Sequence, residues 1–225
     1  MTIPSSFKKA LLAGVLISIG ALFSIAAKPY GNVVQGLCFS VGLFGVLCCN
    51  ASLFTGRVLD VQEIWRENIN VTDLIVLLVT VWVLNLIGAV CVAAMATIIH
   101  FDASYAAQFK AALPWHELLI RAVLCNVLVC LAVWTYRETW RSGWERNRNS
   151  SLVLDAIASC VLPVACFVAC GFEHSVADML YMPLGLMQGA VGIADCLRVI
   201  LLATIGNVIG GIAFSWLVYE GKEPE

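Results

Sequence analysis

Charge is what this chain has least of. Only 12% of its 225 residues are charged, whereas 61% are hydrophobic. That balance excludes an ordinary soluble domain, in which about 25% of the residues are charged. No stretch between two apolar runs is longer than 26 residues, so we expect no separate catalytic or regulatory domain. We therefore expect the function to lie within the membrane.

Patterns that carry the chemistry of several enzyme classes are also missing. The ten cysteines include no CxxC pair, which argues against a disulfide framework and against a metal site. There is no glycine-rich nucleotide-binding loop. Of the three histidines, only His174 is placed deep in the membrane, whereas His100 and His116 lie near the predicted outer surface, and haem binding would need an intramembrane pair. We expect no cofactor, no metal, no enzyme activity and no nucleic-acid partner.

Six long apolar runs are present instead. They cover 10–27, 33–54, 74–99, 115–136, 151–172 and 199–219. Each is close to the ~20 residues that a helix needs to cross the hydrocarbon core of a bilayer. The first run lacks a small-residue cleavage site, so we interpret it as a retained span. The uncharged stretch 179–194 is short for a span and is interpreted as the second half of a broken fifth helix.

Positive charge is placed unevenly around these runs. With the N-terminus inside and six crossings, nine Lys and Arg residues fall on the inner side and three on the outer side. The nine are Lys8, Lys9, Arg57, Arg66, Arg137, Arg141, Arg146, Arg148 and Lys222, and the three are Lys28, Lys110 and Arg198. This excess follows the positive-inside rule, so we expect a multi-pass protein of the cell (inner) membrane with both termini cytoplasmic.

The chain is organised as two similar halves. A late span of each half carries a nearly identical core, Asn85-Leu86-Ile87-Gly88 in the first and Asn207-Val208-Ile209-Gly210 in the second. Phe54 lies 31 residues before the first core, and Phe172 lies 35 residues before the second. We therefore align these two phenylalanines as equivalent positions.

Three spans per half is an odd number, so the halves would have opposite orientations in the membrane. Inverted repeats with interrupted helices are a common transporter design, with the site at the interruption. The prediction is an all-α membrane protein with a single transmembrane domain over 1–225. Its six transmembrane helices form two inverted three-helix repeats, about 8–99 and 111–219. The second and fifth helices are interrupted, and we place the breaks at Thr55-Gly56 and at Gly171.

One polar stretch, Gly171 to Met179, lies in the middle of an apolar region. A charge at bilayer depth costs about 2.5–3.5 kcal/mol, so such residues usually face a protein interior or a water-filled path. The His174 imidazole, with an unperturbed pKa near ~6.5, can exchange a proton with a weak acid. We predict that Glu173 and His174 line a permeation pathway; the alternative is a core histidine with a structural role.

Other side chains are candidates for the same pathway. Asn85, Asn126 and Asn207 lie deep in spans, where each amide needs partners. We expect Asn126 and Asn207 to face the solute and Asn85 to join helices. Lys110, just before the fourth span, either concentrates anions at the outer mouth or anchors the helix at the interface. Large apolar side chains next to the breaks are predicted to form dry constrictions; they are Leu53, Phe54 and Phe172.

Four motifs resemble the formate/nitrite transporter family over nearly the whole chain. They are Leu53-Phe54-Thr55-Gly56, the stretch from Leu124 to Trp134 around Asn126, the stretch from Gly171 to Met179, and Thr204-Ile205-Gly206-Asn207. The resemblance implies an aquaporin-like fold of six helices and a homopentamer in which each protomer has its own pore. It also implies transport of small monovalent weak-acid anions: formate, nitrite or hydrosulfide.

The resemblance also implies roles for individual residues. By motif, Thr55 would contact His174, and Lys110 would lie in the outer vestibule. The polar groups around a central chamber would be Glu173, Asn126 and Asn207, and the constriction residues would include Leu53 and Phe54. The chain departs from the family at three positions: Ser52 stands where many members have Glu, Arg57 where they have Asn or His, and Asp178 where Asn is frequent.

Formate is the first expected substrate, because the region from Leu162 to Leu184 is most similar to the formate channels. The departures at Ser52 and Arg57 leave hydrosulfide open, and nitrite stays an alternative within the family. The expected mechanism is passage of the neutral acid, or of the anion with a proton. A neutral-solute pore of the aquaporin type is the alternative from another class, but it needs two Asn-Pro-Ala loops, and the chain has a single Asn50-Ala51-Ser52.

Overall fold

The computed structural model describes residues 3–145, 152–219 and 221, and every regular element in them is helical. The helices are α1 Ile3–Ala26, α2 Asn32–Cys48, α3 Phe54–Arg57, α4 Val61–Trp65, α5 Val71–Ile98, α6 Ser104–Ala112, α7 Trp115–Glu145, α8 Leu152–Ala169, α9 Ser175–Met187 and α10 Ile193–Leu217, with 3-10 turns η1 Lys28–Tyr30 and η2 Val58–Asp60. The all-α prediction is confirmed. Arg146, Arg148 and Lys222, which were placed on the inner side, lie outside the described residues.

Four stretches in the described residues are long and apolar enough to cross a membrane: Ser6–Ala26, Val71–Ile98, Trp115–Trp140 and Ile193–Leu217. The apolar helices Asn32–Cys48 and Leu154–Ala169 are shorter. These two correspond to the predicted second and fifth runs. Both helices end before the corresponding apolar run does, α2 at Cys48 and α8 at Ala169, and a non-helical segment follows each.

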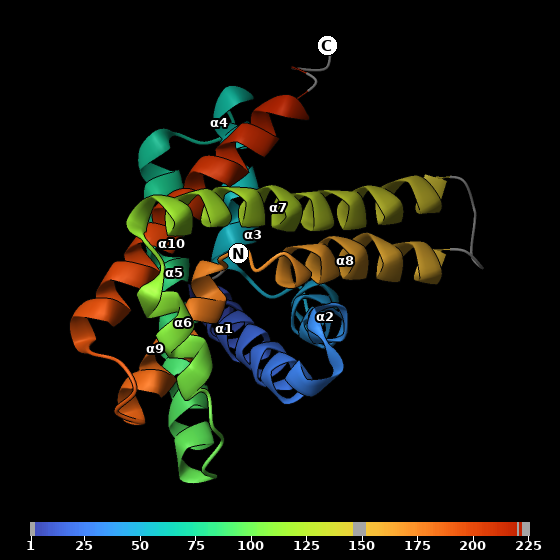
Figure 1. Ribbon diagram of the computed structural model, residues 1–225. Helices are drawn as coiled ribbons and strands as arrows, with labels where there is room; N and C mark the ends of the chain where they lie inside the picture. Colours follow the sequence, from blue (N-terminus) through green and yellow to red (C-terminus); the bar gives the residue numbers. More distant parts are fainter. Residues whose placement is uncertain (1–2, 146–151, 220, 222–225) are drawn as a thin grey trace.

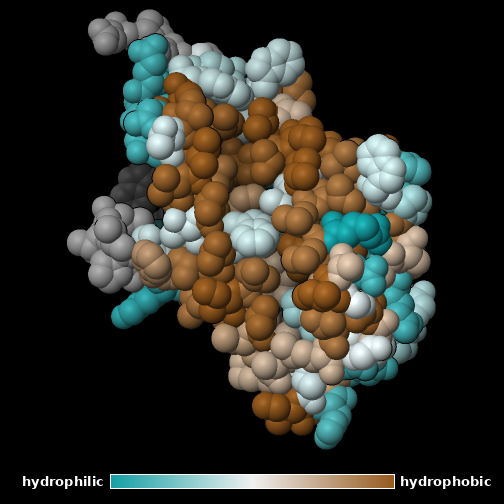
Figure 2. All heavy atoms as spheres, turned by 90° about the vertical axis from the view of Figure 1, so that its left-hand side faces the viewer, coloured by the Kyte–Doolittle hydropathy of each residue, from teal (hydrophilic) through white to brown (hydrophobic). Residues whose placement is uncertain are grey.

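The surface is apolar where α5 and α10 are exposed. Figure 2 shows a broad hydrophobic face on the side of the molecule where these helices lie in Figure 1. On α10 the exposed side chains recur about every four residues, at Leu197, Leu201, Ile205, Ile209 and Trp216. An exposed apolar stripe of this kind is unfavourable in water, and it suits contact with lipid or with another apolar surface.

Glycines allow two pairs of helices to touch. A Cβ atom on Gly88 of α5 would lie 2.4 Å from the Leu11 carbonyl oxygen of α1, and one on Gly210 of α10 would lie 2.1 Å from the Val123 carbonyl oxygen of α7. Any side chain at these positions would separate the helices. The close approach of α1 to α5 and of α7 to α10 brings the asparagine one turn before each glycine, Asn85 or Asn207, against its neighbouring helix.

Candidate functional site

Two short non-helical segments, which we call the first and second breaks, interrupt the apolar helices. The first covers 49–53, between α2 and α3, and includes Asn50 with φ of 47°. The second covers 170–174, between α8 and α9, and includes Gly171 with φ of 68°. The prediction of a break at Gly171 is confirmed. The prediction for the first half is wrong, because Thr55 and Gly56 lie inside α3 and the non-helical segment comes before them.

Asn85 holds the helix that follows the first break. Its Oδ1 accepts a hydrogen bond of 2.9 Å from the backbone N–H of Phe54, and its Nδ2 donates to the carbonyl oxygens of Ala10, at 2.7 Å, and Ser52, at 3.1 Å. The side chain of Asn85 is fully buried. We call this arrangement the Asn85 bracket. It provides hydrogen bonds to backbone N–H and carbonyl groups that the interruption of the helix would otherwise leave unpaired in an apolar interior.

Asn207 forms a matching arrangement, the Asn207 bracket, at the second break. Its Oδ1 accepts from the backbone N–H of Ser175 at 2.8 Å, and its Nδ2 donates to the carbonyl oxygens of Ala122, at 2.7 Å, and Glu173, at 3.0 Å. The residue equivalent to Phe54 is therefore Ser175. Our alignment of Phe54 with Phe172 was wrong by three residues, because the similarity of aromatic residues misled it.

His174 is the residue that ends the second break and caps α9. Its Nδ1 accepts a hydrogen bond of 3.1 Å from the backbone N–H of Ala177. Because that nitrogen must offer a lone pair, the neutral ring carries its proton on Nε2. Nε2 lies 3.0 Å from Thr55 Oγ1, so the imidazole donates to the hydroxyl of a residue just past the first break. This hydrogen bond joins a residue of the first half to one of the second.

Two aromatic rings surround the imidazole. The ring of Phe167 stacks on it, with centroids 5.9 Å apart and planes at 16°, and the ring of Phe39 meets it edge-on at 6.3 Å and 72°. All three side chains are at least 97% buried. Such surroundings disfavour a charged ring, which agrees with the neutral imidazole indicated by the hydrogen bonds.

Asn126 lies beside both breaks. Its Nδ2 donates to the carbonyl oxygens of Asn207, at 2.6 Å, and Thr55, at 3.3 Å, and Gly211 leaves the space that this amide fills. Its Oδ1 is buried with no hydrogen-bond partner among the described residues. A buried acceptor of this kind is available to a donor that enters the site.

An ion cluster lies next to His174. Lys110 of α6 pairs through Nζ with Glu173 Oε2 and, at 2.8 Å, with Asp178 Oδ1. The Glu173 and Asp178 side chains are 2% and 0% exposed, and that of Lys110 is 11% exposed. Two carboxyl groups therefore share one buried ammonium group.

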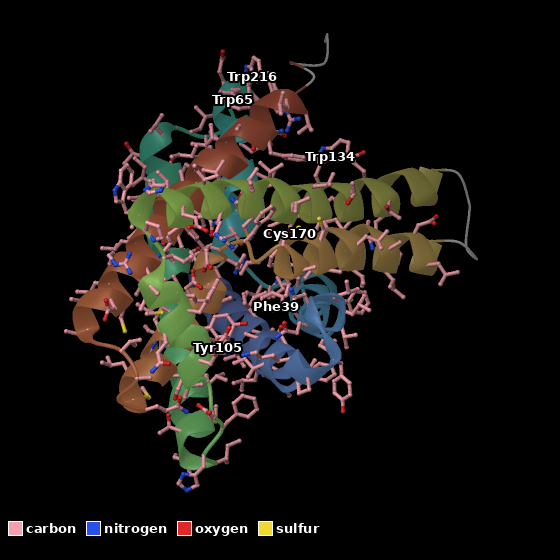
Figure 3. All side chains as sticks on the ribbon, viewed as in Figure 1. Phe39, Trp65, Tyr105, Trp134, Cys170 and Trp216 are labelled. Carbon is pink, nitrogen blue, oxygen red and sulfur yellow. The ribbon has the colours of Figure 1, made fainter. Side chains whose placement is uncertain are left out.

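Two cavities meet this region. The first, the Lys110 cavity, has a volume of about 510 Å³, and its lining includes Lys110, Glu173, His174, Phe39, Tyr105 and Lys28. The second, the Arg57 cavity, has a volume of about 150 Å³, and its lining includes Asn50, Leu53, Arg57, Tyr136 and Arg137. In Figure 3, Phe39 and Tyr105 lie below the second break, which Cys170 marks, whereas Trp65 and Trp216 lie at the other end of the molecule.

The predicted constriction residues have different positions. Leu53 ends the first break, lines the Arg57 cavity and is 3% exposed. Phe172 lines the Lys110 cavity. Phe54 is 3% exposed and lines neither of these two cavities. Thr55, which is fully buried and contacts His174, lines neither of these two cavities.

The structure adds residues that the sequence did not single out. Phe39 and Phe167 frame the imidazole, and no short motif marks them. Asp178 joins the ion cluster, and its burial within a polar motif was the available signal. Arg121 of α7 donates from Nη1 to the Gly171 carbonyl oxygen at 2.8 Å and so holds the second break.

The chain has apolar spans, two interrupted helices, and buried polar groups near two cavities. These features are typical of a multi-pass membrane protein of the transport type. The family model described as "Formate/nitrite transporter" matches residues 1–220. The chain therefore belongs to the formate/nitrite transporter family.

Curated relatives carry the names of channels and transporters, not of enzymes. The chain is 34% identical to a "Probable formate transporter" of Methanothermobacter thermautotrophicus, covering 92% of this chain and 85% of the relative. It is 31% identical to "Formate channel FocA" of Escherichia coli K12, covering 95% and 85%. It is 29% identical to "Nitrite transporter NirC" of Salmonella typhimurium, covering 94% and 77%.

Solved structures show the same fold. An "FNT family ion channel" matches with a TM-score of 0.81 at 23% identity, covering 96% of this chain and 89% of that one. A "Pentameric formate channel with formate bound" matches with a TM-score of 0.75 at 24% identity, covering 96% and 97%.

Proposed function

We propose that the protein is a channel for small monovalent anions of weak acids, with formate as the first substrate, and that the solute passes as the neutral acid or together with a proton. The names of the relatives support formate, and one relative supports nitrite as the alternative. Hydrosulfide, the third candidate, is named by none of them. The observation that carries the mechanism is the buried contact between Thr55 and His174, beside which His174 lines the Lys110 cavity and Leu53 lines the Arg57 cavity.

The separation between the cavities selects against a bare anion. Moving an isolated charge out of water into surroundings such as Leu53, Phe39 and Phe167 is far more costly than moving a neutral acid of the same size. Lys110 would offer a hydrogen-bond donor to the anion, and Lys28, in the same cavity lining, would add positive charge that favours its approach. The acid then forms by uptake of a proton, crosses between the cavities, and loses the proton on the far side. Transport would be electroneutral and would run in either direction.

The proton has two possible sources, water in the Lys110 cavity and the His174–Thr55 pair. The geometry favours water, because Nδ1 of His174 already accepts the Ala177 N–H and Nε2 already donates to Thr55. A further proton on Nδ1 would cost the cap of α9. In this proposal the neutral His174 donates a hydrogen bond to the solute in place of Thr55. Asn126 Oδ1 accepts a hydrogen bond from the hydroxyl group of the acid.

We also propose the arrangement of the protein in the membrane: six spans in two inverted repeats, about 8–99 and 111–219, both termini in the cytoplasm, and a homopentamer in the cell membrane. The matching Asn85 and Asn207 brackets support the repeat. The pentameric formate channel of similar fold supports the assembly. Native mass spectrometry of the purified protein and accessibility of cysteines introduced at the two ends would test the assembly and the orientation.

Proteoliposome uptake tests the function. Formate, nitrite, hydrosulfide and chloride are compared at external pH from about 5 to about 8 while the internal pH is recorded. The proposal expects one weak-acid anion to enter with protons, faster at low pH, with chloride excluded. Chloride flux equal to that of formate, without proton movement, would make the protein a simple anion channel and His174 a structural residue.

A further inference from the structure

The ion cluster holds one carboxyl group more than its single lysine can balance. Lys110 contacts both Glu173 and Asp178 through the same Nζ, which brings the two carboxyl groups next to each other. Fully ionised, the cluster would carry a net charge of −1 in a site where both carboxyl side chains are at least 98% buried. An uncompensated buried charge is strongly unfavourable.

The excess negative charge of the ionised cluster would lie on Asp178. Glu173 has the Lys110 ammonium on Oε2 and lines the Lys110 cavity. Asp178 is fully buried, is not part of the cavity lining, and its Oδ2 has no hydrogen-bond partner among the described residues. A carboxylate oxygen in that position lacks any stabilising donor. A protonated Oδ2 would itself become a donor, with the Glu173 carboxylate as its acceptor.

We propose that Glu173 and Asp178 share one proton at neutral pH, so that the cluster with Lys110 is neutral, and that Asp178 thereby makes the charge of the Lys110 cavity depend on pH. Two carboxyl groups that share a site cannot easily both ionise. When the shared proton leaves at higher pH, the cluster becomes negative and repels an approaching anion. Asp178 is a positioning residue in this proposal, since it acts through Glu173 and Lys110.

Among the described residues, no second positive charge next to the cluster balances the extra carboxylate. The Lys110 ammonium lies 5.0 Å from the ring centroid of Tyr181, one turn beyond Asp178 on α9. Cys125 of α7 and the neutral His174 are the remaining titratable side chains close to it. Helices α1, α5 and α10 also pack on α9, but their described residues form no ion pair with the cluster.

Infrared spectroscopy of the wild-type protein and of Asp178→Asn is the direct test. Among the described residues, Glu173 and Asp178 are the only carboxyl side chains that are buried. A protonated-carboxyl C=O band is expected at neutral pH in the wild type, and it should disappear both at alkaline pH and in D178N. Asp73→Asn, the same change at an exposed position of α5, should leave the band unchanged. A wild type without the band, or a band that survives in D178N, overturns the proposal.

The functional consequence rests on the proposed anion transport and is measured separately. Wild-type flux should fall with rising pH more steeply than the supply of protonated substrate, whereas D178N should keep roughly tenfold more flux at alkaline pH. That factor is the effect of one unit charge at about 12 Å with an effective dielectric constant near 20. Equal pH profiles together with the expected infrared result would overturn the link to transport. Absence of flux in the wild type, with the infrared band present, would instead contradict the proposed function. Should D178N fail to fold, the infrared titration of the wild type still decides whether the proton is shared.

Discussion

The Asn85 and Asn207 brackets can be aligned residue by residue, and the alignment shows what each half of the molecule contributes. The amides held by Oδ1 belong to Phe54 and Ser175, and the asparagine lies 31 residues later in the first half and 32 in the second. The carbonyls held by Nδ2 include those of Ser52 and Glu173. The backbone solution to a broken helix is therefore the same in both halves.

The side chains at these equivalent positions differ in kind. The residue before the held amide is Leu53 in the first half and His174 in the second. One position earlier, Ser52 accepts from Arg57 Nε at 2.9 Å, whereas Glu173 pairs with Lys110. The first bracket thus presents an apolar side chain and the second presents the polar chemistry. Because the scaffold is shared, the difference in function must come from two or three side chains at each break.

The cations next to the two brackets, Lys110 and Arg57, are expected to show the largest difference between the halves. Lys110→Met would leave Glu173 and Asp178 buried without a counter-charge, and we expect a loss of about 3–5 kcal/mol of stability. Arg57→Met should cost less than about 1 kcal/mol, because Arg57 is 27% exposed and pairs with an Asp60 that is itself 16% exposed. Thermal unfolding in detergent measures both. Equal losses would show that the two cations have the same structural role.

The two asparagines should be alike where the cations differ. Asn207→Ala leaves the Ser175 N–H and the Glu173 carbonyl unpaired, and Asn85→Ala does the same to Phe54 and Ser52. We expect each variant to lose about 2–3 kcal/mol, since an unpaired buried polar group costs about 1–3 kcal/mol. Unfolding of the two purified variants side by side provides the measurement. A loss confined to one variant would break the equivalence of the brackets.

Much of this arrangement could be predicted from the sequence. The repeated Asn-x-Ile-Gly core identified Asn85 and Asn207 because a buried amide and a contact glycine leave a clear signature. The first break could not be placed, because Asn50 adopts a positive φ without a glycine to mark it. Phe39 and Phe167 were not predicted either. Their contact with His174 depends on how α2 and α8 pack, and a phenylalanine in an apolar helix carries no sign of its partner.

The hydrogen bond between Thr55 and His174 can be tested by two variants of Thr55. Thr55→Val keeps the shape of the side chain but removes the hydroxyl that accepts from His174 Nε2, whereas Thr55→Ser keeps the hydroxyl. We expect T55V to lower formate flux roughly fivefold, equivalent to about 1 kcal/mol for one buried hydrogen bond, and T55S to stay within twofold of the wild type. Uptake is measured at equal amounts of reconstituted protein. Equal flux in T55V and T55S would mean that the bond serves only the fold.

The smallest expected effect lies where the two halves cease to match. Helix α9 continues to Met187 after its bracket, whereas α3 ends at Arg57 and the chain turns through η2 and α4. At the end of that turn, Glu63 accepts from Asn68 at 2.7 Å and from Arg66 at 2.8 Å. The bond from Asn68, followed by the interaction with Arg66, holds the pKa of the Glu63 carboxyl below its ordinary value of 4.5.

A carboxyl group whose pKa is lowered by folding contributes stability above its unfolded pKa and loses it as the pH falls through the folded value. Glu63→Gln should therefore cost stability at neutral pH and nothing at pH values well below 4.5. The Glu63 side chain is 37% exposed, so we expect only a few tenths of a kcal/mol. Urea or thermal unfolding at the two pH values gives the difference. A loss above about 1 kcal/mol would show that this turn stabilises the first half, in place of the helical continuation that the second half has.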